Sequence, residues 1–128
     1  MPPSNPPQRG DIFWADFPKE HSVGSEQYGR RPVLVVSANS INQAIPTVVI
    51  VPLTSQTQKK NRQFRIAIPE SQKIPEPGTA GCPGESIALT EQVRMVSTIR
   101  LDNQRVARVT GSAIGAVEAG LSFVLSIP

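Results

Sequence analysis

Two short apolar runs constrain the fold of this chain more than any other feature. Residues 32–37 and 47–53 are continuous stretches rich in valine and isoleucine. Each run is short for a helix, and an unbroken run of β-branched residues is typical of a strand buried on both faces. We therefore expect two central strands, and a fold built around them.

Other short segments fit the same interpretation. Apolar and branched residues recur over three further stretches that we expect to be strands, at residues 12–17, 64–68 and 86–90. Residues 91–103 fit a strand followed by a helical turn at 97–101. Glycine, proline and charged residues dominate 18–28 and 69–84, which we expect to be loops.

Helical signals are few. Residues 39–44 fit one helical turn, with Ser40 and Gln43 spaced like a capping box. Near the end of the chain, Thr110 is the expected N-cap of a helix. Its apolar stripe is Ile114, Val117, Leu121, Val124 and Leu125. Gly115 and Gly120 each weaken that helix by about 1 kcal/mol relative to alanine, so it needs tertiary packing.

These elements predict a mainly β fold with short helices: a small, strongly bent antiparallel sheet or barrel with a C-terminal helix. A length of 128 residues suits one domain, which we place at residues 9–128. Residues 1–8 contain four prolines and are expected to be a disordered tail. No apolar run approaches the roughly 20 residues of a membrane span, and 1–10 lack the apolar core of a signal peptide. We expect a cytoplasmic protein.

The rarest residue types exclude several classes of site. Cys82 is the only cysteine and His21 the only histidine, so neither an internal disulfide nor a metal centre is expected, and no cofactor motif is present. Thirteen basic against ten acidic side chains give a net charge of +3, which permits a nucleic-acid partner without requiring one. The basic residues cluster as Arg30 and Arg31, and again at Lys59, Lys60, Arg62 and Arg65. Each cluster alone is more typical of a solvated face.

A possible site begins in the segment 24–36, which reads GSEQYGRRPVLVV. Arg31 precedes Pro32, which favours extended backbone at the start of a strand and allows the guanidinium to hold a phosphate with two donors. Arg30 is expected to be exposed and to act through its charge alone. Glu26, next to Gln27, has three open roles: an ion pair with an arginine, orientation of Arg31, or acceptance of a proton.

Hydroxyl and amide groups follow two other expected strands. The segment 52–56 reads PLTSQ, and Thr54 there either caps the next turn or donates a hydrogen bond to a phosphate oxygen, with Ser55 beside it. Glu91 and Gln92 follow residues 86–90 and repeat the Glu-Gln pair of the first segment. They either face the same cleft or form a structural ion pair.

The groups in these segments suit one kind of chemistry. We find no metal-ligand set, no glycine loop for phosphate and no nucleophile beside a base, but a cation and hydroxyls suited to a phosphate. RNA carries its own nucleophile in the 2′-hydroxyl. A protein could therefore cleave RNA by aligning that oxygen, stabilising the charge of the phosphorane and assisting two proton transfers.

Four motifs in this order resemble the MazF/PemK family of toxin ribonucleases. The family pattern reads G-[DE]-I-x-x-x-D, then G-x-E-Q-x-G-x-R-P, then P-[LVI]-[TS]-[ST], and later [DE]-Q-x-R. In this chain the motifs occupy residues 10–16, 24–32, 52–55 and 91–94, and the resemblance spans residues 9–125. Some members have histidine where this chain has Ser25, so it looks closer to the branch that relies on arginine and threonine.

The resemblance implies a small SH3-like barrel of the MazF and CcdB type, and a homodimer. It implies a toxin that cleaves single-stranded RNA at short sequences without a metal, leaving a 2′,3′-cyclic phosphate and a 5′-hydroxyl. It also implies an antitoxin with an acidic, disordered segment. Arg31, Thr54 and Glu26 would be catalytic. The expected RNA-binding residues are Ser25, Gln27, Arg30, Ser55, Lys59, Lys60, Glu91 and Gln92.

Two other hypotheses remain open from the sequence. Toxins that poison DNA gyrase share this fold and bind a protein instead of cutting RNA. They would not need the Glu-Gln turn, the arginine before proline and the strand-end threonine together. A decayed toxin that only binds RNA or antitoxin would keep the basic residues and could lose the catalytic set.

Overall fold

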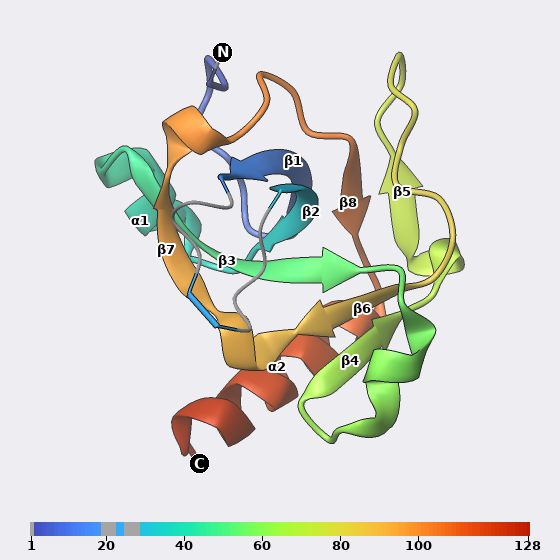
Figure 1. The fold of residues 1–128 in the computed structure, drawn as a ribbon. Helices are drawn as coiled ribbons and strands as arrows, with labels where there is room; N and C mark the ends of the chain where they lie inside the picture. Colours follow the sequence, from blue (N-terminus) through green and yellow to red (C-terminus); the bar gives the residue numbers. More distant parts are fainter. Residues whose placement is uncertain (1, 19–22, 25–28) are drawn as a thin grey trace.

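The structure is a computed structural model, and it describes residues 2–18, 23, 24 and 29–128 (Figure 1). Eight strands are present in this part of the chain. They are β1 (Asp11–Phe17), β2 (Gly29–Val35), β3 (Thr47–Thr54), β4 (Arg65–Ile68), β5 (Lys73–Pro75), β6 (Ser86–Leu89), β7 (Arg94–Ser97) and β8 (Ala107–Val109). The helices are α1 (Asn39–Ala44) and α2 (Ser112–Leu125), with the short 3-10 helices η2 (Thr57–Asn61), η3 (Glu70–Gln72), η4 (Thr90–Gln92) and η5 (Thr98–Arg100).

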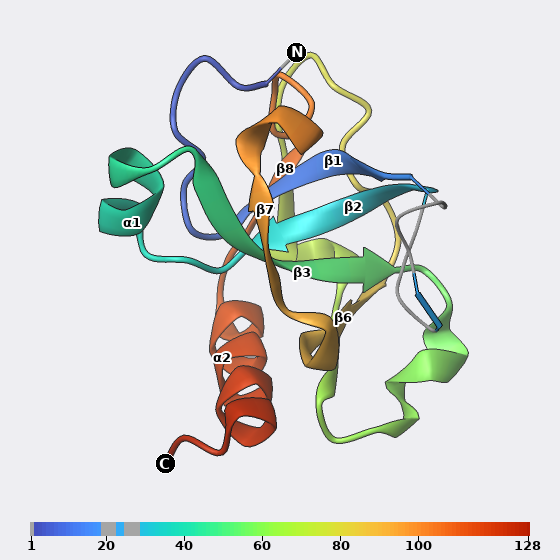
Figure 2. The same ribbon diagram turned by 60° about the vertical axis from the view of Figure 1, so that its left-hand side comes forward.

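The strands form one bent sheet that is nearly closed into a barrel. Their order is β4-β6-β3-β2-β1-β8-β5, and β7 pairs with β3. All strand pairs among the described residues are antiparallel. The N-terminal segment and α2 lie at opposite ends of the molecule (Figures 1 and 2). The predicted mainly β barrel with short helices and a C-terminal helix is confirmed.

The central strands β2 and β3 are buried on both faces, as their unbroken apolar runs predicted. Val33 and Val35 of β2 belong to one core cluster, and Leu34 between them belongs to a second. The second cluster also receives Ala113 and Val117 of α2. Because alternate residues of a strand point to opposite faces, the sheet separates two apolar layers, and α2 covers only one of them.

Two strands were absent from the sequence prediction. The first is β5, which lies with η3 in the proline-rich stretch 69–84 that was expected to be a loop. The second is β8, at 107–109 and so later in the chain than β6 and β7. Each of these strands has only three residues, and they pair with each other, Lys73 opposite Val109. Strands this short carry no detectable periodicity, so only the long-range pairing reveals them.

Both predicted helix caps are wrong. The N-cap of α1 is Ala38, with no side-chain cap, so Ser40 and Gln43 do not form a capping box. The N-cap of α2 is Gly111 instead of Thr110. A distant residue supplies the missing acceptor: the backbone N–H of Ala113 donates to Oε1 of Gln72, at 2.6 Å. A cap from another element leaves no local pattern for sequence reasoning to find.

The buried face of α2 differs slightly from the predicted stripe. Ala113, Val117 and Gly120 are buried, whereas Leu125 is 54% exposed. A Cβ atom at Gly120 would lie 3.0 Å from Thr90 and 3.1 Å from Ile66. Gly120 therefore permits the close approach of α2 to the sheet, and its cost in helix propensity is offset by that packing.

Residues 2–8 run beside the start of β1. Pro7 is buried, and the backbone N–H of Gln8 donates to Oδ2 of Asp11 at 2.9 Å. The division of the chain into a tail at 1–8 and a domain at 9–128 stays a prediction. Among the helices of the described residues, none has the length and apolar character needed to cross a membrane.

Candidate functional site

The candidate site lies at the end of β3. On one edge of β3 the pairing with β2 ends at Val33 and Pro52, and on the other edge Leu53 and Thr54 pair with β6. Proline has no N–H to donate, which favours the end of a ladder at this point. Continued for two more residues, the β2–β3 register would place Arg31 opposite Thr54.

A pocket of about 310 Å³ occupies this point. Its lining comes from β1, β2, the end of β3 and the segment that leads into β6. The lining residues are Trp14, Arg30, Arg31, Pro32, Leu53, Thr54, Ser55, Cys82, Pro83 and Ser86. Among these residues the only ionisable side chains besides Cys82 are the two arginines. The polar part of the described lining therefore presents cations and hydroxyls, beside apolar residues such as Trp14 and Leu53.

Thr54, the last residue of β3, carries a buried hydroxyl. It is only 3% exposed, and its backbone is fixed by the pairing of Thr54 with Ile87. Its Oγ1 accepts a hydrogen bond from the backbone N–H of Gln56 at 3.2 Å. A hydroxyl has one proton as well as its acceptor sites. Because the contact with Gln56 uses an acceptor site, the Thr54 proton can be donated to a ligand in the pocket.

The two arginines of β2 have different surroundings. Arg31 is half-buried opposite Ala15, and both it and Arg30 line the pocket. Arg30 forms a two-point ion pair with Asp102, with Nη1 and Oδ1 2.9 Å apart, and its guanidinium lies 5.6 Å from the ring centre of Trp14. Asp102 raises the pKa of Arg30, and Arg30 in turn lowers the pKa of Asp102.

Four of the predicted site residues therefore lie together: Arg30, Arg31, Thr54 and Ser55. Four others do not line this pocket: Lys59, Lys60, Glu91 and Gln92. Lys59 and Lys60 belong to η2, and Nζ of Lys60 lies 3.4 Å from a carboxylate oxygen of Glu85. Ser25, Glu26 and Gln27 lie outside the described residues, as does His21.

Glu91 has a structural partner. Its Oε2 accepts hydrogen bonds from Nε and Nη2 of Arg65, at 3.0 and 2.8 Å. This is the ion pair that the sequence left open as the alternative to a functional role. The other carboxylate oxygen, Oε1, is buried and has no hydrogen-bond partner among the described residues. The RNA-binding role of Glu91 and of its neighbour Gln92 stays a prediction.

Sequence reasoning missed part of the lining of the pocket. Trp14, Cys82, Pro83 and Ser86 all line it, and the side chain of Lys73 lies behind Cys82 and Ser86. Trp14 and Ser86 lie in strands that the sequence predicted, and those positions were the available signals. Lys73 and Cys82 lie in the stretch expected to be a loop, where nothing local indicates their proximity.

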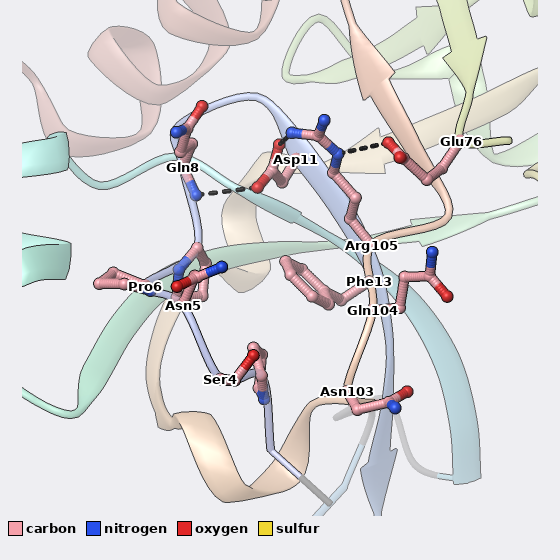
Figure 3. A pocket seen from close by; sticks show the side chains of 12 residues that line it. Ser4, Asn5, Pro6, Gln8, Asp11, Phe13, Glu76, Asn103, Gln104 and Arg105 are labelled. Carbon is pink, nitrogen blue, oxygen red and sulfur yellow. Dashed lines mark hydrogen bonds and ion pairs between the residues drawn. The ribbon is translucent and has the colours of Figure 1, made fainter.

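A second pocket, of about 280 Å³, lies beneath the N-terminal segment (Figure 3). Arg105 lies between two carboxylates there: its Nε is 2.6 Å from Glu76 and its Nη1 is 3.2 Å from Asp11. These contacts, that with Glu76 foremost, raise the pKa of Arg105. Asp11 is buried and also accepts the N–H of Gln8. The charges of this pocket are thus satisfied by one another.

Comparison with known sequences agrees with the four-motif pattern. Residues 8–125 match the family described as PemK-like, MazF-like toxin of type II toxin-antitoxin system. The chain is 29% identical over 120 residues to endoribonuclease EndoA of Bacillus subtilis (strain 168), covering 94% of this chain and 95% of that protein. It is 31% identical over 91 residues to the endoribonuclease toxin MazF of Escherichia coli (strain K12), covering 71% and 68%.

Solved structures share the fold. A crystal structure of MazF from Deinococcus radiodurans matches with a TM-score of 0.71 and 24% identity, covering 96% of this chain and 99% of that one. An endoribonuclease in complex with its cognate antitoxin from a mycobacterial species matches with a TM-score of 0.69 and 21% identity, covering 95% and 97%. With a family match across nearly the whole sequence and the same barrel, this chain belongs to the PemK-like, MazF-like toxins of type II toxin-antitoxin systems.

Proposed function

We propose that this protein is a toxin endoribonuclease that cuts single-stranded RNA in the pocket at the end of β3. The observation that carries the proposal is the joint position of Arg31 and Thr54 at one pocket, on strands that diverge there. Sequence similarity to proteins named endoribonucleases supports the same reaction.

In the proposed reaction, the 2′-oxygen of the RNA attacks the adjacent phosphorus in line with the bond to the 5′-oxygen. A bond from phosphorus to the 2′-oxygen forms as the bond to the 5′-oxygen breaks. One proton leaves the 2′-hydroxyl and another reaches the departing 5′-oxygen. The products are a 2′,3′-cyclic phosphate and a 5′-hydroxyl. The proposed reaction needs no metal ion.

The three proposed catalytic side chains have different roles in that reaction. Arg31 places its guanidinium on the non-bridging phosphate oxygens, where negative charge increases in the transition state. Thr54 donates its hydroxyl proton to one of the same oxygens. Glu26, from the segment predicted by the sequence, is our candidate for one of the two proton transfers.

The partners follow from the same assignment. Solved neighbours include an endoribonuclease with its cognate antitoxin and MazE–MazF complexes from Deinococcus radiodurans. We infer that this toxin also has a cognate antitoxin, whose acidic, disordered segment competes with RNA for the basic residues around the pocket. We further infer a cytoplasmic homodimer.

The decisive experiment incubates the purified protein with a long single-stranded RNA in EDTA. Arg31→Ala, purified in parallel, controls for contaminating nucleases. Discrete cuts with 5′-hydroxyl ends and cyclic phosphates are expected from the wild type only. Intact RNA at high protein concentration contradicts the proposal and favours a toxin that binds a protein target. Cuts that appear only after Mg²⁺ is added contradict the metal-free mechanism.

A further inference from the structure

Lys73 is a buried cation next to the pocket. It is 5% exposed, and its backbone is fixed by the pairing of β5 with β8. Its Nζ donates to Oγ of Ser86 at 2.7 Å and lies 3.6 Å from Sγ of Cys82. No carboxylate of the described residues forms an ion pair with it. Burial of an ammonium group without an opposite charge is costly, so the position calls for an explanation.

The contacts of Lys73 lead directly to the pocket wall. Both Ser86 and Cys82 line the pocket, whereas Lys73 itself does not. Thr54 and Arg31 line the same pocket. The charge of Lys73 therefore lies directly behind the lining of the pocket that holds the two proposed catalytic residues. In the protein interior, charge acts over such short distances with little screening.

Hydrogen-bond chemistry determines what Ser86 can do. An ammonium group can only donate, so Oγ of Ser86 must accept from Lys73. The single proton of Ser86 then points elsewhere, toward the pocket or toward Sγ of Cys82, 3.8 Å away. Sulfur is a weak acceptor, and a phosphate oxygen in the pocket would be a much stronger one. The Lys73 contact thus prepares Ser86 to donate to an anion.

We propose that Lys73 is a positioning residue of the nuclease, acting through Ser86 to hold the phosphate of the scissile bond. The inference rests on the proposed function and adds a second hydroxyl donor to the pocket, from the first residue of the strand that pairs with the end of β3. The ammonium group orients Ser86 and increases the attraction of the pocket for a phosphodiester. The anion supplied by RNA then offsets the buried charge of Lys73.

The test compares Lys73→Met, Ser86→Ala and the double variant as full chains, by kcat and KM on one RNA. We expect each single variant to lower kcat about tenfold or more, because hydrogen bonds to charged groups contribute strongly. We expect the double variant to be no slower than the slower single one. The control is Ser37→Ala, a buried serine hydrogen-bonded to Asn42 away from the pocket, which should lower the melting temperature without changing kcat.

Two results overturn the proposal: a folded Lys73→Met that cuts at the normal kcat, or losses that multiply in the double variant. If Lys73→Met does not fold, Ser86→Ala and Ser86→Cys test the proposal in its place, because both lack the hydroxyl donor. A normal kcat in either variant contradicts the proposal.

A separate titration distinguishes failure of this inference from failure of the proposed function. If the wild type leaves RNA intact, the nuclease proposal fails. Binding of inorganic phosphate, followed through the amide signals of Thr54 and Ser86, then tests Lys73 alone. We expect about tenfold weaker phosphate binding by Lys73→Met than by the wild type. Equal affinities, or no binding by either protein, overturn the inference.

Discussion

The two pockets have similar volumes, about 310 and 280 Å³, and each has arginine in its wall, but their charges are balanced differently. Beneath the N-terminal segment, Arg105 lies between Asp11 and Glu76. At the end of β3, the described lining has Arg30 and Arg31, with Lys73 behind the wall, and no carboxylate. The acidic partner of Arg30, Asp102, is not part of that lining.

The difference shows how the same residue type serves two purposes. An arginine with two carboxylates fixes elements that are distant in sequence and offers little to a ligand. A wall of cations and hydroxyls is stable with an anion present, and a phosphodiester is such an anion. We therefore expect changes at the first pocket to affect stability and changes at the second to affect RNA cleavage.

The largest expected effect is on catalysis. Arg31→Ala and Thr54→Val should each lower kcat by about 10²–10³-fold or more, because each removes a donor to the charge that develops on phosphate. Rates of RNA cleavage by folded variants measure this. Arg105→Met serves as the contrasting variant and should cut at the normal rate. A folded Arg31→Ala with normal kcat would contradict the expected difference between the two pockets.

A smaller but clear effect is expected on stability. Arg105→Met should lower the free energy of unfolding by about 2–3 kcal/mol, because it removes one partner of the buried Asp11. Arg108 and the N–H of Gln8 still contact Asp11, which limits the loss. Urea unfolding measures it. Arg62→Met, at an exposed position, is the control and should change stability by less than about 0.5 kcal/mol.

Arg30 separates binding from catalysis within one pocket. Arg30→Gln should raise KM a few-fold and leave kcat nearly unchanged, because its guanidinium is already held by Asp102. Binding of a 2′-deoxy oligonucleotide at several salt concentrations measures how much the charge of Arg30 contributes to binding. The slope of log affinity against log salt should fall by about 0.7, the value for one single-strand phosphate contact. A loss of kcat as large as that of Arg31→Ala would instead make the two arginines equivalent.

The smallest effect concerns pH. Because Arg30 lowers the pKa of Asp102, the pair contributes stability above the ordinary pKa of a carboxyl group. That contribution is lost as pH falls through the lowered pKa of the folded state. The side chains of Arg30 and Asp102 are 51% and 37% exposed, so the stability that the pair contributes should stay below about 1 kcal/mol. Urea unfolding of wild type and Asp102→Asn should differ at neutral pH and converge in strong acid; a constant difference contradicts this.

The predictable parts of the molecule were those with local signals. The valine-rich runs of β2 and β3 indicated buried central strands, and Arg31 and Thr54 stood out because each lies beside a strand signal. In contrast, β5 and β8 form only through each other, and α2 takes its cap from Gln72. Lys73 comes to lie behind the pocket lining through the same long-range pairing, so no local pattern could have placed it there.

The pairing of β3 along both edges also has a consequence for motion. One edge pairs with β7 from Thr47 to Ile50 and with β6 at Leu53 and Thr54, and the other edge pairs with β2 from Ile50 to Pro52. Opening the strand there requires several neighbours to separate, so its amides should exchange with solvent only at the cost of near-global unfolding. Ser55 follows directly and is exposed. Thr54 is thus anchored on a strand that is paired along both edges, directly beside a residue that is open to solvent.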